Sequence, residues 1–151
     1  MSVVIDTGHF DAQILARLQT ITPASKVYDL DVEKTPPAIP GQPGRVRPYL
    51  VYQAPGPGRP EQIELAETGD SVVLRPLVKC VAGYRHDVVN LVAHTRAVLE
   101  HWAPAAPDGV NVSVSRLAFA FGFTPGNVAI DRSETPPRPW LLLQYAYTVS
   151  T

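Results

Sequence analysis

The side chains of this sequence best suited to chemistry lie between residues 80 and 101. His86 and Asp87 form a histidine–aspartate dipeptide, which supplies two metal ligands in metal-dependent phosphohydrolases. Those enzymes are mainly helical and take further ligands from other helices, and no matching set of histidines and aspartates follows here. We therefore interpret Asp87 as a residue of a helix N-terminus, where its negative charge is favourable.

The remaining candidates for catalysis or ligand binding also lack the required spacing. His94 and His101 lie seven residues apart on one predicted helix, whereas zinc sites on a helix need closer spacing and a third ligand, so we expect a half-exposed surface pair. Cys80, the single cysteine, has no glycine-rich elbow around it and is expected to be a buried strand residue. The glycines of GQPG and GPG match no phosphate-binding loop. The sequence thus predicts no catalytic residue, no metal site and no cofactor, so we expect a protein that is not an enzyme.

Arginine and aromatic residues flank three proline-rich segments, residues 35–46, 54–60 and 124–139. Half of the 16 prolines lie between Pro36 and Pro60, and such segments run extended outside a sheet. Arginine and aromatic residues are enriched at protein interfaces, so we hypothesise a contact surface, although solvated loop charge is an alternative. The predicted interface residues are Arg45, Arg47, Tyr49, Arg59, Arg132, Arg138 and Trp140.

A strand followed by a helix, from Ser71 to Trp102, is the segment that must position these residues. The strand is expected over residues 71–82, because apolar residues such as Leu74, Val78 and Cys80 alternate along it. After a turn at Gly83, a helix is expected over residues 84–102, because its apolar residues recur three and four apart and end in Leu99 and Trp102.

The other segments can be assigned to elements around this unit. Residues 1–9 form a lead-in with a cap at residues 6–8, and a helix is expected over residues 10–21. Strands are expected over residues 26–29, 48–53, 61–65 (a hairpin towards the central strand), 110–123 (with a bulge near Arg116) and 140–151. The prediction is one α+β domain, residues 1–151, with a mostly antiparallel sheet, two amphipathic helices packed on one face and long proline-rich loops. The other face would be partly exposed or covered by another copy.

Composition limits the possible partners. The net charge is −1 and the pI about 6.4, so no basic field favours nucleic acid or an acidic membrane surface. No apolar run approaches the ~20 residues of a membrane span, and the first residues do not resemble a secretory leader. We expect a soluble protein made in the cytoplasm.

The order of these segments resembles that of the tail terminator proteins of long-tailed, siphovirus-type bacteriophages. The resemblance is carried by the helix of residues 10–21, the PYLVYQ strand, the strand–helix unit of residues 71–102 and the final WLLLQYAYTVST strand. It covers nearly the whole chain but includes no diagnostic motif. The loops at residues 35–46 and 124–139 look longer and richer in proline than in that family.

The resemblance implies a structural virion protein of the phage neck. Such a protein caps the tail tube as a hexameric ring, ends tube polymerisation and provides the surface for head–tail joining. Its partners would be further copies of itself, the tail tube protein and a head-closure or connector protein, and DNA would pass through the ring lumen without sequence-specific binding. It would be made in the host bacterial cytoplasm, end up in the virion and need no membrane. The alternatives are another neck or tail component, such as a head-closure or tail-tube-related protein, and a small hydrolase.

Overall fold

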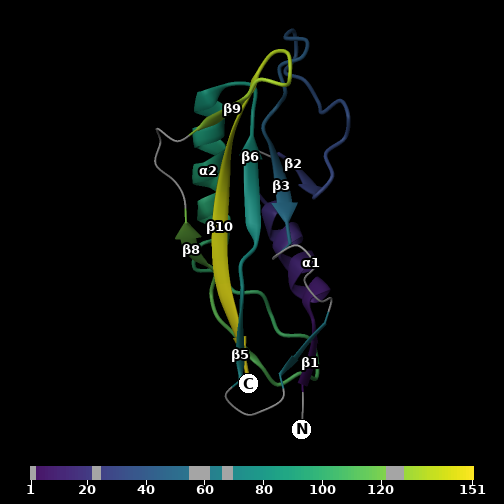
Figure 1. Cartoon of the computed structure of the whole chain (residues 1–151), viewed down its shortest axis with the longest axis vertical. Coiled ribbons are helices and arrows are strands. Elements are labelled where there is room, and N and C mark those ends of the chain that lie inside the picture. The colour runs from purple at the N-terminus through teal and green to yellow at the C-terminus, as the bar shows by residue number, and fades with distance from the viewer. Residues whose placement is uncertain (1–2, 22–24, 55–61, 66–69, 122–127) are drawn as a thin grey trace.

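The computed structural model describes residues 3–21, 25–54, 62–65, 70–121 and 128–151 (Figure 1). Within these residues the chain forms a mixed sheet of eight strands, two helices and a separate two-stranded ribbon. The α+β class predicted from the sequence is therefore confirmed. Of the strand pairs in the main sheet, β2 (Lys26–Asp29) and β3 (Tyr49–Gln53) run parallel and the other pairs run antiparallel.

The last strand, β10 (Arg138–Ser150), is the axis of the sheet. One edge of β10 pairs with β6 (Leu77–Val81) and then β5 (Ser71–Leu74), and its other edge pairs with β9 (Ala129–Asp131), β8 (Ala118–Phe121) and β7 (Ser113–Val114). Its residues alternate between buried and partly exposed along the whole length, as expected of a strand with one face in the core. The alternation places Leu141, Leu143, Tyr145, Tyr147 and Val149 on one face of the strand, and all five are buried.

The central strand, expected to be continuous from residue 71 to residue 82, is divided at Arg75 and Pro76 into β5 and β6. Proline has no backbone N–H to donate to a sheet, so the ladder is interrupted there. The Pro76 carbonyl nevertheless accepts a hydrogen bond from the Tyr145 N–H at 3.0 Å, so both pieces follow β10. Leu74 before the break and Val78 and Cys80 after it lie on the same face of the sheet and are buried, as predicted.

Both helices contribute buried residues to the core that also contains the inward face of β10. The helix α1 (Thr7–Leu18) begins earlier than predicted, and its N-cap is Asp6, whose carboxylate accepts a hydrogen bond from the Gly8 N–H at 2.9 Å. The helix α2 (Arg85–Leu99) ends before the predicted residue 102, so Trp102 lies beyond it and is only partly buried. The helices are joined by a hydrogen bond of 2.8 Å from the Arg17 Nε–H to the Val98 carbonyl.

A second, smaller cluster of buried residues lies where β2, β3 and β6 run side by side. Its members are Tyr28, Val46, Tyr49, Val51 and Val81, with Val32 and Trp140 packed against it. Val32 and Val46 come from the long connection between β2 and β3. The β2–β3 connection therefore packs against part of the sheet.

Three sequence-based expectations about strands are wrong. The lead-in contains a strand, β1 (Val3–Asp6), which pairs with β4 (Gln62–Leu65), so β4 forms no hairpin with the central strand. The strand expected to be continuous over residues 110–123 is two short strands, β7 and β8, separated by residues 115–117, where an irregularity near Arg116 was predicted. The segment over residues 124–139 contains β9 and the start of β10, because these residues pair with each other across a turn. The loop of residues 54–60 lies almost entirely outside the described residues.

Candidate functional site

Two of the three predicted proline-rich loops meet at one end of the molecule, opposite β1 and the end of β10 (Figure 1). We call residues 35–47 and 132–137 the loop end. A Cβ atom added to Gly44 would lie only 2.9 Å from Cδ of Pro136, so the two loops are in direct contact. Gly44 also has a φ of 81°, which favours glycine. The fold thus joins segments about ninety residues apart into one surface.

The first loop is held in a compact turn by its own backbone. Ala38 and Val46 form an isolated antiparallel bridge, and the Ile39 N–H donates to the Arg45 carbonyl at 2.7 Å. The Gln42 N–H donates to the Ile39 carbonyl at 3.0 Å within the same turn. This arrangement follows the pattern of a short hairpin, so the segment is ordered despite its prolines.

Arg45 fastens this turn to the start of α2. Its Nη1–H donates to the Gly83 carbonyl at 2.9 Å, and its guanidinium lies 4.7 Å from the centre of the Tyr84 ring. The Tyr84 hydroxyl in turn donates to the side-chain carbonyl of Gln42. A guanidinium held by a carbonyl and an aromatic face is well satisfied within the chain. Arg45 therefore serves to position the loop.

Three further predicted interface residues also pack within the chain. Tyr49 is only 5% exposed, and burial raises the pKa of its phenol although a hydrogen bond with Arg138 works against the shift. Arg138 forms an ion pair with Glu134 at 3.6 Å. The Trp140 ring lies beneath the Lys79 ammonium, 4.6 Å from ring centre to nitrogen. These contacts brace the second cluster against the β9–β10 turn.

The exposed cations of the loop end are Arg47 and Arg132. Arg132 lies in the turn between β9 and β10, and Arg47 immediately precedes Pro48 and β3. Arg59 lies outside the described residues. Of the seven predicted interface residues, the structure thus leaves two arginines as clear candidates for contact with another molecule.

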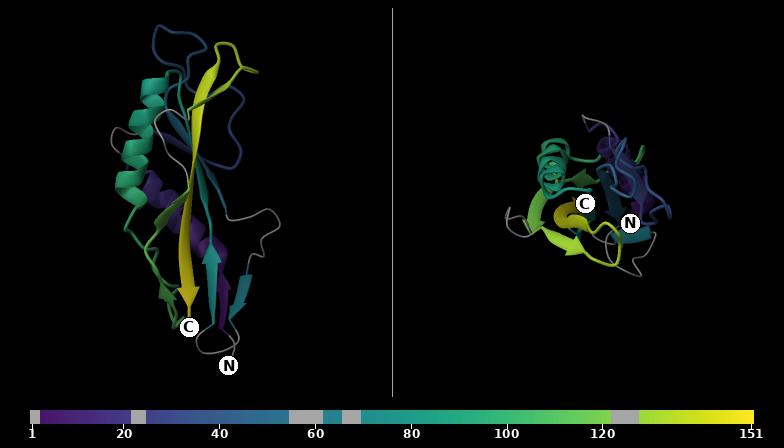
Figure 2. Two further views of the ribbon diagram at one scale, coloured as in Figure 1. Left: turned by 60° about the vertical axis from the view of Figure 1, so that its left-hand side comes forward. Right: turned by 90° about the horizontal axis from the view of Figure 1, so that it is seen from above.

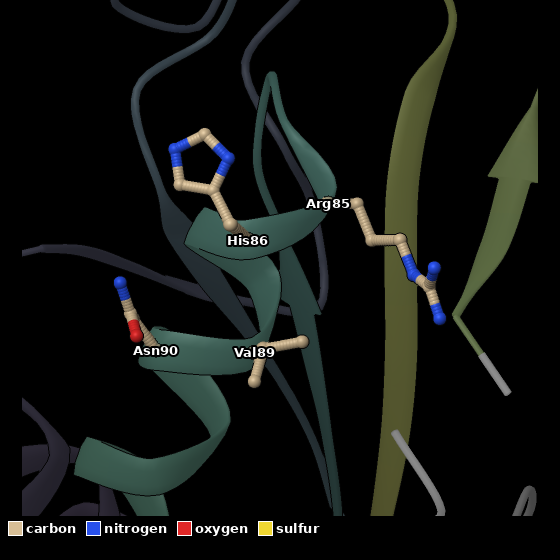
Figure 3. Close-up of a pocket in the computed structure, with 4 residues that line it drawn as sticks. All are labelled: Arg85, His86, Val89 and Asn90. Carbon is tan, nitrogen blue, oxygen red and sulfur yellow. The ribbon is translucent and has the colours of Figure 1, made fainter. Parts of the chain in front are cut away.

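The histidine–aspartate dipeptide lies at the start of α2. The His86 ring is 75% exposed, and its Nε2 lies 3.3 Å from an Asp87 carboxylate oxygen. In Figure 3 the Arg85 side chain points to the opposite side of the helix from those of His86 and Asn90, and these residues line a hollow together with Val89. Residues of one short helical stretch form only one wall, so they do not surround a substrate. His101 lies beyond the end of α2, so it does not share a helix with His94 as expected.

No group of three or more histidine, cysteine, aspartate or glutamate side chains in the described part of the chain is placed to hold a metal ion. No helix among these residues is long and apolar enough to cross a membrane. Neither a protein-family model nor a curated protein sequence matches the chain.

Cys80 is buried in β6, as predicted, with its Sγ 3.8 Å from the Thr95 hydroxyl oxygen. Burial raises the pKa of the thiol to about 12. Because the thiolate is the reactive form, we expect the native protein at pH 8 to resist labelling by a thiol reagent such as dithionitrobenzoate, and the unfolded protein to react fully. Rapid labelling in native buffer, with unfolding excluded by circular dichroism, would contradict this prediction.

Gln42 in the loop end, and Gly83 and Tyr84 beside it, are contact residues that sequence analysis did not identify, although it expected a turn at Gly83. Gly83 is buried, and a Cβ atom there would lie 2.9 Å from the Val46 carbonyl oxygen. The available signal was the glycine itself, which marks a close approach of two backbones. Which backbone approaches it depends on the fold and not on neighbouring residues.

Proposed function

We propose that this chain is a tail terminator subunit. In this role it caps the tail tube of a long-tailed phage as a hexameric ring, ends tube polymerisation and provides the surface on which the head joins. The observation that supports this best is that the four segments carrying the resemblance become α1, β3, the β5–β6–α2 unit and β10. Residues from all four build a single core. The resemblance therefore rests on the elements that determine the fold.

The proposed arrangement places α1 and α2 over one face of the sheet and leaves the other face and the loop end for neighbours. Part of that other face is covered by Val32 and Val46 of the long β2–β3 connection. Further along it, Leu77, Leu142 and Gln144 remain partly exposed. A ring subunit needs two unlike surfaces, because each copy contacts one neighbour on either side. The tail tube and the head-closure protein would bind the two ends of the ring, with DNA in its lumen.

The proposal is tested by removing the gene from its phage and examining the lysate by electron microscopy. We expect DNA-filled heads without tails, together with tubes of abnormal and variable length, because nothing would end polymerisation. Restoring the gene from a plasmid should restore regular tails, and this serves as the control. Regular tails joined to heads in the deletion strain would exclude the function. Regular tails lying unattached would instead assign the chain to head closure, the main alternative.

A further inference from the structure

A small hollow lies between the first half of α2 and the residues that precede β2 and β3. Its lining residues are Ser25, Pro48, Asp87, Asn90, Leu91 and His94, and its volume is about 140 Å³. Pockets that bind metabolites usually measure roughly 300–1,000 Å³. The hollow therefore suits the end of one side chain better than a free small molecule.

The chemistry of the lining favours a guanidinium. Asp87 contributes a carboxylate that is 27% exposed and has one oxygen 3.3 Å from His86 Nε2, and Asn90 and Ser25 contribute further oxygen atoms. Pro48 and Leu91 provide apolar walls for the methylene groups of a long side chain. A planar cation with several N–H donors matches such a set, because it can bond a carboxylate and a neighbouring oxygen together.

Arg132 is the arginine best placed to enter this hollow on another copy. It is exposed and has no ion-pair partner within the described residues, whereas Arg45 donates to the Gly83 carbonyl and Arg138 pairs with Glu134. It also adjoins β9, at one edge of the sheet, whereas the hollow opens beside β2 and the start of β3, at the other edge. Arg47 adjoins the hollow itself and so lies at the wrong edge to reach a neighbour's hollow.

The two groups also lie at the same level of the molecule. Val81, which precedes α2, pairs with Trp140 of β10, and Asp131, which precedes Arg132, pairs with Arg138. Figure 2 shows α2 and the β9–β10 turn reaching towards the same end. When two copies stand side by side, Arg132 of one copy would therefore lie at the same height as the hollow of the next copy. Arg116 lies near the opposite end of β10, since the adjacent Ser115 N–H bonds the Thr148 carbonyl.

We propose that Arg132 of each copy inserts into the hollow of its neighbour and pairs with Asp87 there. This contact rests on the proposed ring and gives that ring its two unlike surfaces, one with the arginine and one with the carboxylate. Because a heterologous contact repeats around a closed ring, every Arg132 and every Asp87 is paired once the ring closes.

A charge exchange tests the pairing by plasmid complementation of the deletion strain. We expect Arg132→Glu and Asp87→Arg, each alone, to lower the yield of infectious particles by at least about tenfold, and the double variant to recover most of that loss. Arg116→Glu, an equal change at an exposed arginine far from the hollow, should have no effect. Thermal melts of the purified variants check that each one folds.

Chemical cross-linking gives a second measurement that keeps Arg132 and Asp87 in place. With Ser133→Cys and Asn90→Cys in one chain, a short bismaleimide should link assembled subunits into a ladder that reaches the closed ring. The pair Ser113→Cys and Asn90→Cys, with one cysteine at the far end of the sheet, should remain unlinked. A ladder that stops at dimers, or no linkage in particles with regular tails, would overturn the contact.

The two proposals fail in different ways. Full complementation by Arg132→Glu and by Asp87→Arg would overturn the contact and leave the terminator function in place. The same conclusion would follow if each single variant were defective and the double variant were equally defective. Regular tails in the deletion strain itself would remove the terminator function, and the ring contact with it.

Discussion

Replacing Leu99 with alanine is expected to lower the free energy of unfolding by about 2–5 kcal/mol. Leu99 is the last residue of α2, is fully buried and belongs to the core shared with both helices and β10. The substitution removes buried methyl groups and leaves a cavity that the close-packed surroundings fill only in part. A loss of this size is a large fraction of the stability of an ordinary domain. Denaturant melts with a common m-value would measure it.

The matched control is Leu30→Ala. Leu30 is 62% exposed, so the same chemical change there should alter stability by less than about 0.5 kcal/mol. Equal losses at positions 99 and 30 would mean that α2 does not pack as described. The two variants lose the same side-chain atoms, which are buried at position 99 and exposed at position 30.

Replacing Gly83 with alanine should have the second largest effect, a loss of about 1–3 kcal/mol. The new Cβ would lie 2.9 Å from the carbonyl oxygen of Val46 and 3.4 Å from its nitrogen. Both atoms belong to the backbone and cannot rotate away, so the turn of residues 35–47 must move off the start of α2. That movement would also release Arg45 from the Gly83 carbonyl, so trypsin should cleave after Arg45 faster than in the unmodified chain.

Gly8→Ala is the control for this variant. The nearest atom to a Cβ at Gly8 is a carboxylate oxygen of Asp6, at 3.1 Å, which belongs to a flexible side chain and need shift by only a few tenths of an ångström. Alanine also favours a helix over glycine by roughly 0.5–1 kcal/mol, so Gly8→Ala should not destabilise the protein. If Gly83→Ala and Gly8→Ala had the same stability and the same rate of trypsin cleavage, the close contact between Gly83 and Val46 would be disproved.

Local sequence patterns predicted the main elements because each of them depends on neighbours in the chain. The alternation along β10 identified its buried face residue by residue, and the spacing of Val88, Leu91 and Val92 identified the inner side of α2. Asp6 was recognised as part of the N-cap because its carboxylate needs only the backbone two residues on. Helix ends were less well placed, since burial of Phe10 and Leu18 does not determine where the last hydrogen bond forms.

Pairing between distant segments was beyond the reach of such patterns. The apolar residues of β1 and β4 gave no sign that these strands pair with each other, because a strand does not encode its partner's position. The same holds for Arg45, Tyr49, Arg138 and Trp140, whose residue types suggested an exposed interface. Contacts with Tyr84, Glu134 and Lys79 turn three of these side chains inward, and burial within the second cluster encloses Tyr49.

The sequence by itself therefore determined the fold class, the buried face of the longest strand and the burial of Cys80, all of which follow from local periodicity. Only the tertiary structure decided that the first and third proline-rich loops meet, with Gly44 against Pro136. It also decided that Arg47 and Arg132 are the arginines left exposed at that end. The physical reason is that the exposure of an arginine depends on which distant backbone and side chains come close to it. Those contacts arise from the order of strands around β10 and not from the residues beside each arginine.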